Sequence, residues 1–204
     1  MSNLTNPTTA EVKENEKSPE ELQKKLKRAE KSVKKYEWLI IRLIIILAII
    51  WVLFFVVIGL THMPSGDMYP RVDSGDLVLF YRLDKDVKAQ DIIVINKVTP
   101  DSNGEEQTFI LRVVAVEGDT VEINGNSLII NGNRMVESNI FYTTTSYAND
   151  AGEEYIEYPL TLQEGQCFVL ADYRNGGEDS RYFGPVDRSE ILGTVITILR
   201  RNGL

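Results

Sequence analysis

Cysteine and histidine are almost absent from this chain of 204 residues, which contains one of each. A single cysteine cannot form an internal disulfide, so packing must hold the fold together even outside the cytoplasm. We expect Cys167 to be a buried thiol rather than a reactive one, because free cysteines are usually buried. Basic character is also scarce beyond residue 60, where acidic residues outnumber basic ones by about two to one. This excess of negative charge argues against nucleic acid as a partner.

Charge is missing altogether from residues 43–60, which are apolar throughout. Residues 38–41 extend this run to about the 20 residues that cross the hydrocarbon core of a membrane. We therefore predict a transmembrane helix over residues 38–60, with Arg42 near its inner end, where a long side chain reaches the headgroups. The length of the run and the polar segment before it favour an uncleaved anchor over a signal peptide.

The basic residues before this helix set its expected orientation. Residues 24–35 contain seven Lys or Arg and one Glu. The positive-inside bias then places the N-terminus in the cytoplasm. We expect a single-pass protein of the plasma membrane, with residues 61–204 forming an extracytoplasmic domain.

The N-terminal tail has two parts. Residues 1–17 are polar without periodicity and are expected to be disordered. Ser18, Pro19 and Glu21 are typical of a helix start, so residues 18–37 are predicted to be a juxtamembrane helix. Its apolar residues follow at alternating spacings of four and three: Leu22, Leu26, Ala29, Val33 and Tyr36. Two heptads are short, so the pattern leaves open an amphipathic helix at the membrane, self-association or a cytoplasmic partner.

The remaining chain has the pattern of strands. Short runs rich in Val, Ile and Phe occur at residues 77–81, 92–95, 109–116, 120–123, 127–130, 167–170 and 193–199. Turn signals such as Asn124-Gly125 and Asn131-Gly132 separate them, and the first of these predicts a hairpin over residues 121–130. We predict a mostly antiparallel β domain with a long, partly irregular excursion over residues 138–165.

Several strings behind the apolar segment lie in a characteristic order. They are Ser65-Gly66-Asp67-Met68-Tyr69-Pro70, Ser74-Gly75-Asp76-Leu77-Val78, Gln90-Asp91-Ile92-Ile93-Val94, Arg112-Val113-Val114 with Gly118-Asp119, and Ala171-Asp172-Tyr173-Arg174-Asn175 running into Asp179-Ser180-Arg181-Tyr182-Phe183-Gly184. Together they resemble the sequence boxes of the type I signal peptidases (peptidase S26) over residues 58–199. This resemblance implies a signal-peptidase-like antiparallel β domain behind one N-terminal transmembrane helix.

The resemblance also locates three losses. In that family a serine attacks the peptide carbonyl, and a neutral lysine in an apolar setting accepts its proton. Here the nucleophile position holds Asp67, the base position Leu111, and the position of the serine that steadies the lysine Gly177. Loss of a nucleophile or base that acts as a unit removes about a million-fold in rate, on the order of 8 kcal/mol.

Other site positions are retained. Ser65 matches the family's side-chain donor to the oxyanion, and residues that hold the shape of the site are matched by Arg112, Asp172, Arg174, Asp179 and Arg181. Residues 64–70 and 107–112 are expected to form a groove that holds an extended peptide as an added strand. Its expected lining residues are Ser65, Gly66, Asp67, Met68, Tyr69, Pro70, Phe109 and Leu111, although core packing or membrane contact is an equal alternative for Met68, Tyr69 and Phe109. We expect no metal and no cofactor.

Substitute catalysts are weaker alternatives. His62 could act as a base near the membrane surface, or Asp67 could pair with Asp119 or Asp172 and activate water as aspartic proteases do. We predict instead a non-cleaving homologue, similar to the signal-peptidase-like pilus-assembly proteins of Gram-positive bacteria, with pilin-like exported polypeptides and a sortase as implied partners. An active signal peptidase with a non-standard site, or a regulator that sequesters signal peptides, remain the other readings.

Overall fold

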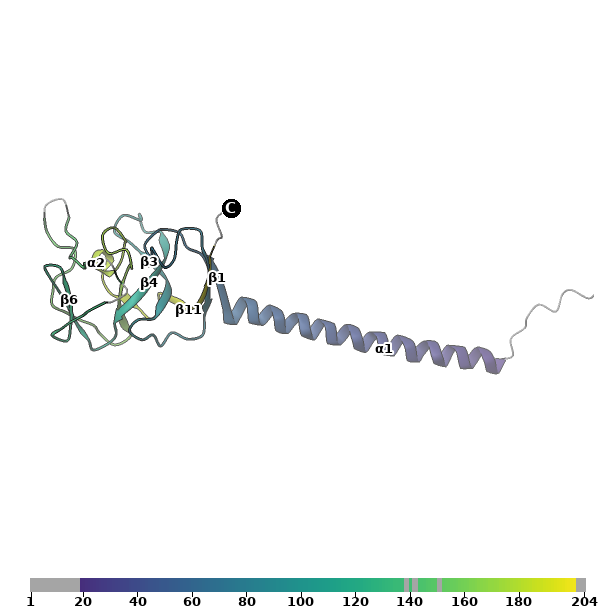
Figure 1. Cartoon of the computed structure of the whole chain (residues 1–204). Coiled ribbons are helices and arrows are strands. Elements are labelled where there is room, and N and C mark those ends of the chain that lie inside the picture. The colour runs from purple at the N-terminus through teal and green to yellow at the C-terminus, as the bar shows by residue number, and fades with distance from the viewer. Residues whose placement is uncertain (1–18, 138–139, 141–142, 150–151, 201–204) are drawn as a thin grey trace, which may run out of the picture. The chain divides into compact units, whose positions relative to one another are not determined.

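The computed structural model describes residues 19–137, 140, 143–149 and 152–200. The chain divides into two compact units at residues 50 and 51, and each unit is considered by itself. Helix α1 (Pro19–Val52) runs without interruption, with Glu20 and Glu21 in its first turn, where negative charge complements the helix dipole (Figure 1). Its start at Pro19 agrees with the predicted helix start, while Ser18 and the predicted disordered tail lie outside the described residues.

The predicted end of the transmembrane helix is wrong. Helix α1 stops at Val52, the π-helical turn η1 (Leu53–Val57) follows, and residues 58–60 already belong to strand β1 (Ile58–His62). Gly59 pairs with Phe80 on the neighbouring strand, and a Cβ at Gly59 would lie 2.1 Å from the Phe80 ring. Hydropathy alone does not distinguish an apolar strand from the end of an apolar helix. The helical part of this segment is nonetheless long and apolar enough to cross a membrane.

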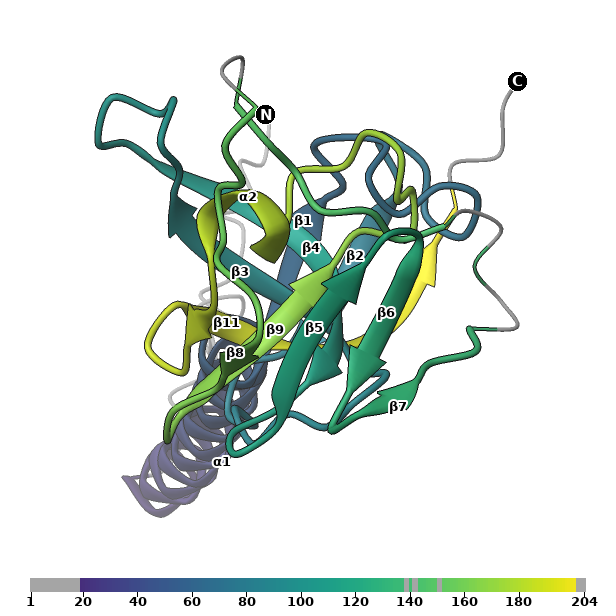
Figure 2. The ribbon, with the colours of Figure 1, turned by 90° about the vertical axis from the view of Figure 1, so that its left-hand side faces the viewer.

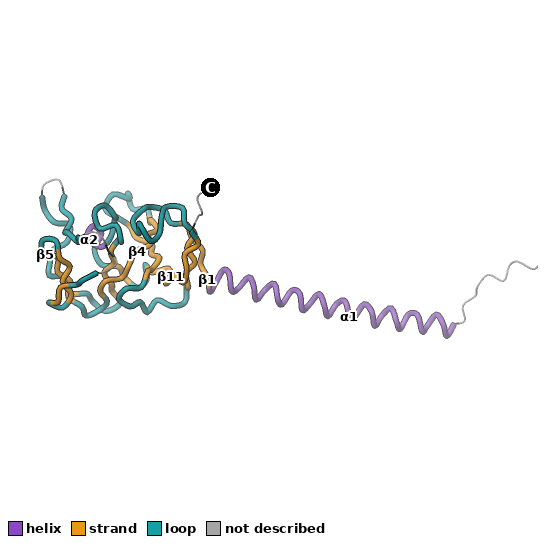
Figure 3. The backbone as a smooth tube through the Cα atoms, viewed as in Figure 1, coloured by secondary structure: helices purple, strands orange, loops and turns teal. Residues whose placement is uncertain are grey.

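Two antiparallel sheets make up the second unit (Figure 3). The larger has the order β1-β2-β11-β3-β4-β9-β10, formed by β1 with β2 (Leu77–Tyr81), β11 (Ile191–Leu199), β3 (Ile92–Val98), β4 (Glu106–Ala115), β9 (Gln166–Leu170) and β10 (Val186–Asp187). The smaller has the order β7-β6-β5-β8, formed by β7 (Asn133–Arg134), β6 (Ser127–Ile130), β5 (Thr120–Asn124) and β8 (Leu160–Thr161) (Figure 2). The predicted antiparallel β class is confirmed.

Each predicted strand run is present, and residues 121–130 form the predicted hairpin, β5 paired with β6. Its turn holds Gly125 at a φ of 58°, a left-handed conformation that glycine adopts readily. The short elements β1, β7, β8, β10 and helix α2 (Ser180–Phe183) were not predicted. Most of these have two to four residues, too few to carry a periodicity of their own.

Strand β4 contributes to all three buried clusters of this unit. Leu111 and Val113 belong to one, Ile110 to the second, and Val114 to the third. A fully buried aliphatic side chain contributes about 1.5–3 kcal/mol, so β4 is a major source of stability. Cys167 packs in the same cluster as Leu111, and burial raises the pKa of its thiol to about 12. The structure thus confirms that the Cys167 thiol is buried.

Candidate functional site

Two loops meet where the sequence places the nucleophile. The first, residues 63–72 after β1, turns sharply because the amides of Arg71 and Val72 both donate to the Met68 carbonyl. The second, residues 171–181, follows β9. The Tyr173 amide donates to the Asp67 carbonyl at 2.7 Å, so the two loops are joined at Asp67, the residue predicted to stand at the nucleophile position.

Asp67 binds the residue that resembles the oxyanion donor. The hydroxyl of Ser65 donates a hydrogen bond to the Asp67 carboxylate, and both side chains are half-buried. Burial raises the pKa of Asp67, the bond from Ser65 opposes this rise, and the negative charge of Asp179 adds to it. The hydroxyl at Ser65 is therefore already engaged by a carboxylate of the same loop.

Gly177 lies next to both Asp67 and Ala171. A Cβ at Gly177 would stand 2.2 Å from the Ala171 Cβ, 3.2 Å from the Tyr173 carbonyl oxygen and 3.4 Å from Asp67 Oδ1. The first distance is shorter than any real contact between such atoms. A side chain at position 177 is therefore incompatible with alanine at position 171 unless the backbone moves.

Leu111 stands at the position predicted for the base. It is fully buried on β4, opposite Ile93, in a cluster that includes Val113 and Ala171. The setting is apolar, as expected, but it holds an aliphatic side chain that cannot accept a proton. Leu111 is thus part of the core and does not line a groove.

Met68 is a second predicted groove residue that lies in the core. Its side chain is fully buried in the cluster that contains Met63, Val72 and Ile110. The turn over residues 68–72 directs it inward, so the prediction of Met68 as a groove residue is wrong. Pro70 is exposed but lines neither of the hollows described next.

Two hollows flank Asp67. One, of about 440 Å³, is lined by Pro64, Ser65, Asp67, Gln107, Thr108, Phe109, Gly176 and Glu178. The other, of about 520 Å³, is lined by Gly66, Asp67, Tyr69, Asp73, Tyr173 and Gly176. Asp67 and Gly176 belong to both linings, so the two hollows adjoin, and together we name them the Asp67 groove. Most of the predicted groove residues are brought together there, and Asp73, Tyr173, Gly176 and Glu178 are added to them.

One edge of β4 opens on the Asp67 groove. Strand β3 pairs with β4 over residues 106–112, whereas β9 pairs with it only over residues 112–115. Within the described part of the chain, residues 107–111 therefore have no strand partner on the β9 side. The backbone amide of Asn96 donates to the Glu190 carbonyl, so the backbone groups of Asn96 point away from β4. Thr108 lies opposite Asn96, and in an antiparallel pair its backbone groups then point away from β3, toward the open edge.

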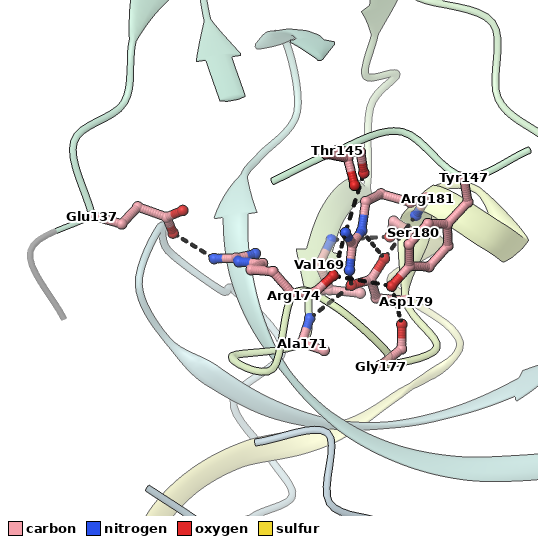
Figure 4. Close-up of polar contacts among 10 residues, drawn as sticks. All are labelled: Glu137, Thr145, Tyr147, Val169, Ala171, Arg174, Gly177, Asp179, Ser180 and Arg181. Carbon is pink, nitrogen blue, oxygen red and sulfur yellow. Dashed lines mark hydrogen bonds and ion pairs between the residues drawn. The ribbon is translucent and has the colours of Figure 1, made fainter. Parts of the chain in front are cut away.

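The loop over residues 171–181 is held by buried charges (Figure 4). Arg181 Nε and Nη2 donate to Asp179 at 2.9 and 2.7 Å, and both side chains are fully buried. Asp179 also accepts from the Ala171 amide, and Arg181 Nη1 donates to the Arg174 carbonyl. The Tyr147 hydroxyl donates to the Gly177 carbonyl at 2.9 Å. These contacts fix the loop that carries Gly177.

A second pair joins this loop to β4. Arg112 donates to both oxygens of Asp172 at 2.8 and 2.7 Å, and its third nitrogen donates to the Gln90 carbonyl at 3.0 Å. Arg174 Nη2 donates to Glu137 at 2.5 Å, and burial lowers the pKa of Arg174. The five residues predicted to hold the shape of the site thus all take part in ion pairs.

The substitute catalysts are not assembled. Asp119 accepts from the Val116 amide and from the Asn131 side chain, and Asp172 is paired with Arg112, so neither carboxylate pairs with Asp67. His62 lies on β1 and lines neither hollow. Among the described residues, the lining of the Asp67 groove includes three carboxylates and no lysine or histidine.

Comparison with known proteins identifies a family whose match includes these positions, and several relatives. The family described as signal peptidase, peptidase S26, matches residues 35–199. A probable thylakoidal processing peptidase 2 of Arabidopsis thaliana is 33% identical over 139 residues, which cover 64% of this chain and 35% of the relative. A probable signal peptidase I-2 of Synechocystis sp. is 28% identical over 138 residues, covering 65% and 58%.

The chain therefore spans about a third of the length of the plant relative and less than two thirds of the cyanobacterial one. A crystal structure of a signal peptidase I from Enterococcus faecalis V583 matches 54% of this chain and 97% of that chain, with 29% identity and a TM-score of 0.38. Because the family match extends over residues 35–199 and includes Asp67, Leu111 and Gly177, this chain belongs to the signal peptidase family, peptidase S26.

Proposed function

We propose that this protein binds extended segments of exported polypeptides in the Asp67 groove and does not cleave them. The observation that carries the proposal is the hydrogen bond from Ser65 to Asp67, together with the full burial of Leu111. An aspartate stands where a hydroxyl nucleophile is needed, and a leucine stands where its proton acceptor is needed. Loss of both leaves only binding, since either loss alone removes about a million-fold in rate.

Peptide binding does not need the lost groups. The open edge of β4 offers backbone donors and acceptors at Thr108, and main-chain hydrogen bonds of this kind hold an added strand. Phe109 lines the same hollow and packs against Phe183, with ring centroids 5.4 Å apart. An extended peptide placed there would run along β4 with its backbone near Ser65 and Asp67.

The charge of the groove sets a preference among peptides. Asp67 and Glu178 line one hollow, and Asp67 and Asp73 line the other, with no basic residue among the described lining residues of either. Complementary charge favours segments that carry Lys or Arg. The groove should therefore prefer basic segments to acidic ones of equal length.

The setting of the proposal is a single-pass membrane protein with a cytoplasmic N-terminus and an extracytoplasmic groove. Helix α1 is apolar enough to span a membrane, and the basic residues before its apolar part support this orientation. Exported precursors are the polypeptides that such a groove would meet. Pilin-like subunits, together with the sortase that joins them, are the partners that the resemblance to pilus-assembly proteins implies.

The test measures binding and cleavage together. Full-length protein in detergent is titrated into a fluorescent peptide that carries the signal segment of an exported precursor, and the mixture is followed by anisotropy and mass spectrometry. We expect saturable binding and an intact peptide. Thr108→Pro should weaken binding by up to about tenfold, because it removes one hydrogen-bond donor worth roughly 0.5–1.5 kcal/mol.

Thr108→Val is the matched control. Both substitutions remove the hydroxyl that donates to Asn96, but valine keeps the backbone amide at the open edge. Proline is tolerated where the amide faces away from the neighbouring strand, so both variants should remain folded. Equal binding by the two variants would contradict β-addition, and a peptide cut at one site by the native protein would contradict the non-cleaving role.

A further inference from the structure

The N-terminal half of α1 carries an apolar stripe that has no partner among the described residues. Between Pro19 and Glu37, every apolar residue after Pro19 lies on this stripe, and all are exposed: Leu22, Leu26, Ala29, Val33 and Tyr36. The spacings of four and three place them at the a and d positions of a heptad repeat, with Leu26 and Val33 at a. We name these five residues the heptad stripe.

The width of the heptad stripe distinguishes between the possible partners. A helix that lies on a membrane surface or on a protein core has three or four apolar residues in every seven, including e or g positions. Here the e positions are Gln23, Glu30 and Glu37, and the g positions are Lys25 and Ser32. Only two positions in seven are apolar, which is the pattern of a coiled-coil seam.

The continuity of α1 gives a second reason. The helix passes from Glu37 into the apolar run without a break, because one α-helix extends from Pro19 to Val52. If the apolar part spans the membrane, residues 19–37 continue along the same axis for about 28 Å. The heptad stripe is then held in water, and it cannot lie flat on the lipid.

The charges beside the stripe indicate what covers it. In a parallel pair of helices, a g residue faces the e residue of the next heptad on the partner, so Lys25 faces Glu30 of the second copy and Ser32 faces Glu37. An antiparallel pair would instead bring like charges together. The other basic residues lie at the outer b, c and f positions: Lys24, Lys27, Arg28, Lys31, Lys34 and Lys35.

We propose that the heptad stripe is the seam of a parallel dimer between two copies of this chain. A shared membrane imposes the parallel orientation that the charges require. The same heptad positions continue within the apolar run at Ile40, Leu43, Leu47 and Ile50, so the seam can extend along the helix. The dimer does not depend on whether the groove binds or cleaves peptides.

Cysteine scanning tests the proposal. Full-length protein is reconstituted in lipid vesicles, and disulfide formation is compared for seam variants Leu26→Cys and Val33→Cys and for outward controls Lys27→Cys and Lys34→Cys. Cys167 is buried, so it can remain or be replaced by alanine if the replacement leaves the protein folded. We expect at least fivefold more cross-linked dimer from the seam variants, and this excess should persist when the vesicles are diluted with lipid.

Charge reversal tests the orientation. Lys25→Glu should reduce the dimer fraction about two- to fivefold, because it places two glutamates opposite each other, and Glu30→Lys in the same chain should restore it. Equal cross-linking at seam and outward positions would overturn the proposal, since a helix covered by lipid or by another protein gives that result. A dimer fraction unchanged by Lys25→Glu would overturn the parallel arrangement.

Discussion

The carboxylate of Asp67 stands at the predicted nucleophile position, and it accepts a hydrogen bond from the hydroxyl of Ser65. A donor that could otherwise meet a peptide carbonyl is thereby bound within its own loop. Burial raises the pKa of both Asp67 and Glu178, and neighbouring carboxylates add to these shifts, Asp179 to that of Asp67 and Asp67 to that of Glu178. At the scale of single residues, the site is arranged around a carboxylate and not around a catalytic pair.

Asp67→Asn should stabilise the protein at neutral pH. The pKa of Asp67 is raised above its ordinary value of 3.8, chiefly by burial, so the folded state binds the proton more tightly than the unfolded state does. The stabilisation that protonated Asp67 gives the folded state is therefore full below pH 3.8, and it is lost as the pH rises through the higher pKa of the folded state. Thermal melts of both proteins should differ at pH 7 and converge near pH 3. A difference that grows as the pH falls would contradict this account.

Gly177→Ser should destabilise the protein, and Ala171→Gly should relieve that loss. A Cβ at position 177 overlaps the Ala171 Cβ at 2.2 Å, and overpacking of this kind costs about 1–3 kcal/mol. Chemical denaturation of the two single variants and the double variant measures the coupling. If Gly177→Ser were equally unstable with either residue at position 171, the proposed overlap would not be its cause.

At the scale of elements, β4 serves both the core and the groove. Its inner residues enter three buried clusters, while residues 107–109 line the open side. Arg112 and Asp172 connect this strand to the loop that carries Gly177. The geometry of the groove therefore depends on a buried ion pair at the point where β9 begins to pair with β4.

Asp172→Ala should reduce stability by about 3–5 kcal/mol, because it leaves the buried Arg112 without its charge partner. Replacing both residues, as Arg112→Met with Asp172→Leu, should recover much of this loss, since a buried pair can be exchanged for apolar packing. Urea unfolding of the three proteins provides the measurement. A loss below about 1 kcal/mol for Asp172→Ala would show that the pair is not a structural link.

The sequence predicted these elements where hydrophobic pattern determined structure. The sequence predicts this strand over residues 109–116, whereas β4 begins at Glu106. The prediction misses residues 106–108 because they are polar and carry no apolar alternation. Those polar residues include two that line the groove, Gln107 and Thr108. The proximity of Glu178 to Asp67, and the overlap between positions 171 and 177, depend on tertiary packing that no local pattern encodes. The sequence string over residues 171–181 indicates that this loop belongs to the site, but it does not predict which residues of the loop contact one another.

At the scale of the whole molecule, each of the two units has its own proposed binding surface. The first unit offers the heptad stripe of α1, and the second offers the Asp67 groove. The family match covers residues 35–199, and within it Asp67, Leu111 and Gly177 stand at the positions predicted for the nucleophile, the base and the serine that steadies the base. The second unit has buried ion pairs and an open edge on β4, whereas Asp67 and Leu111 do not supply a serine and a lysine.

Restoration of the catalytic groups tests this account most directly. The variant combines Asp67→Ser, Leu111→Lys, Gly177→Ser and Ala171→Gly, the last to admit the new serine. Native protein and variant, both full-length in detergent, are incubated with a signal-peptide-bearing precursor, and cleavage is followed by mass spectrometry. We predict that the native protein leaves the precursor intact and that the variant cuts it at one site. Cleavage at a defined site by the native protein would contradict the account.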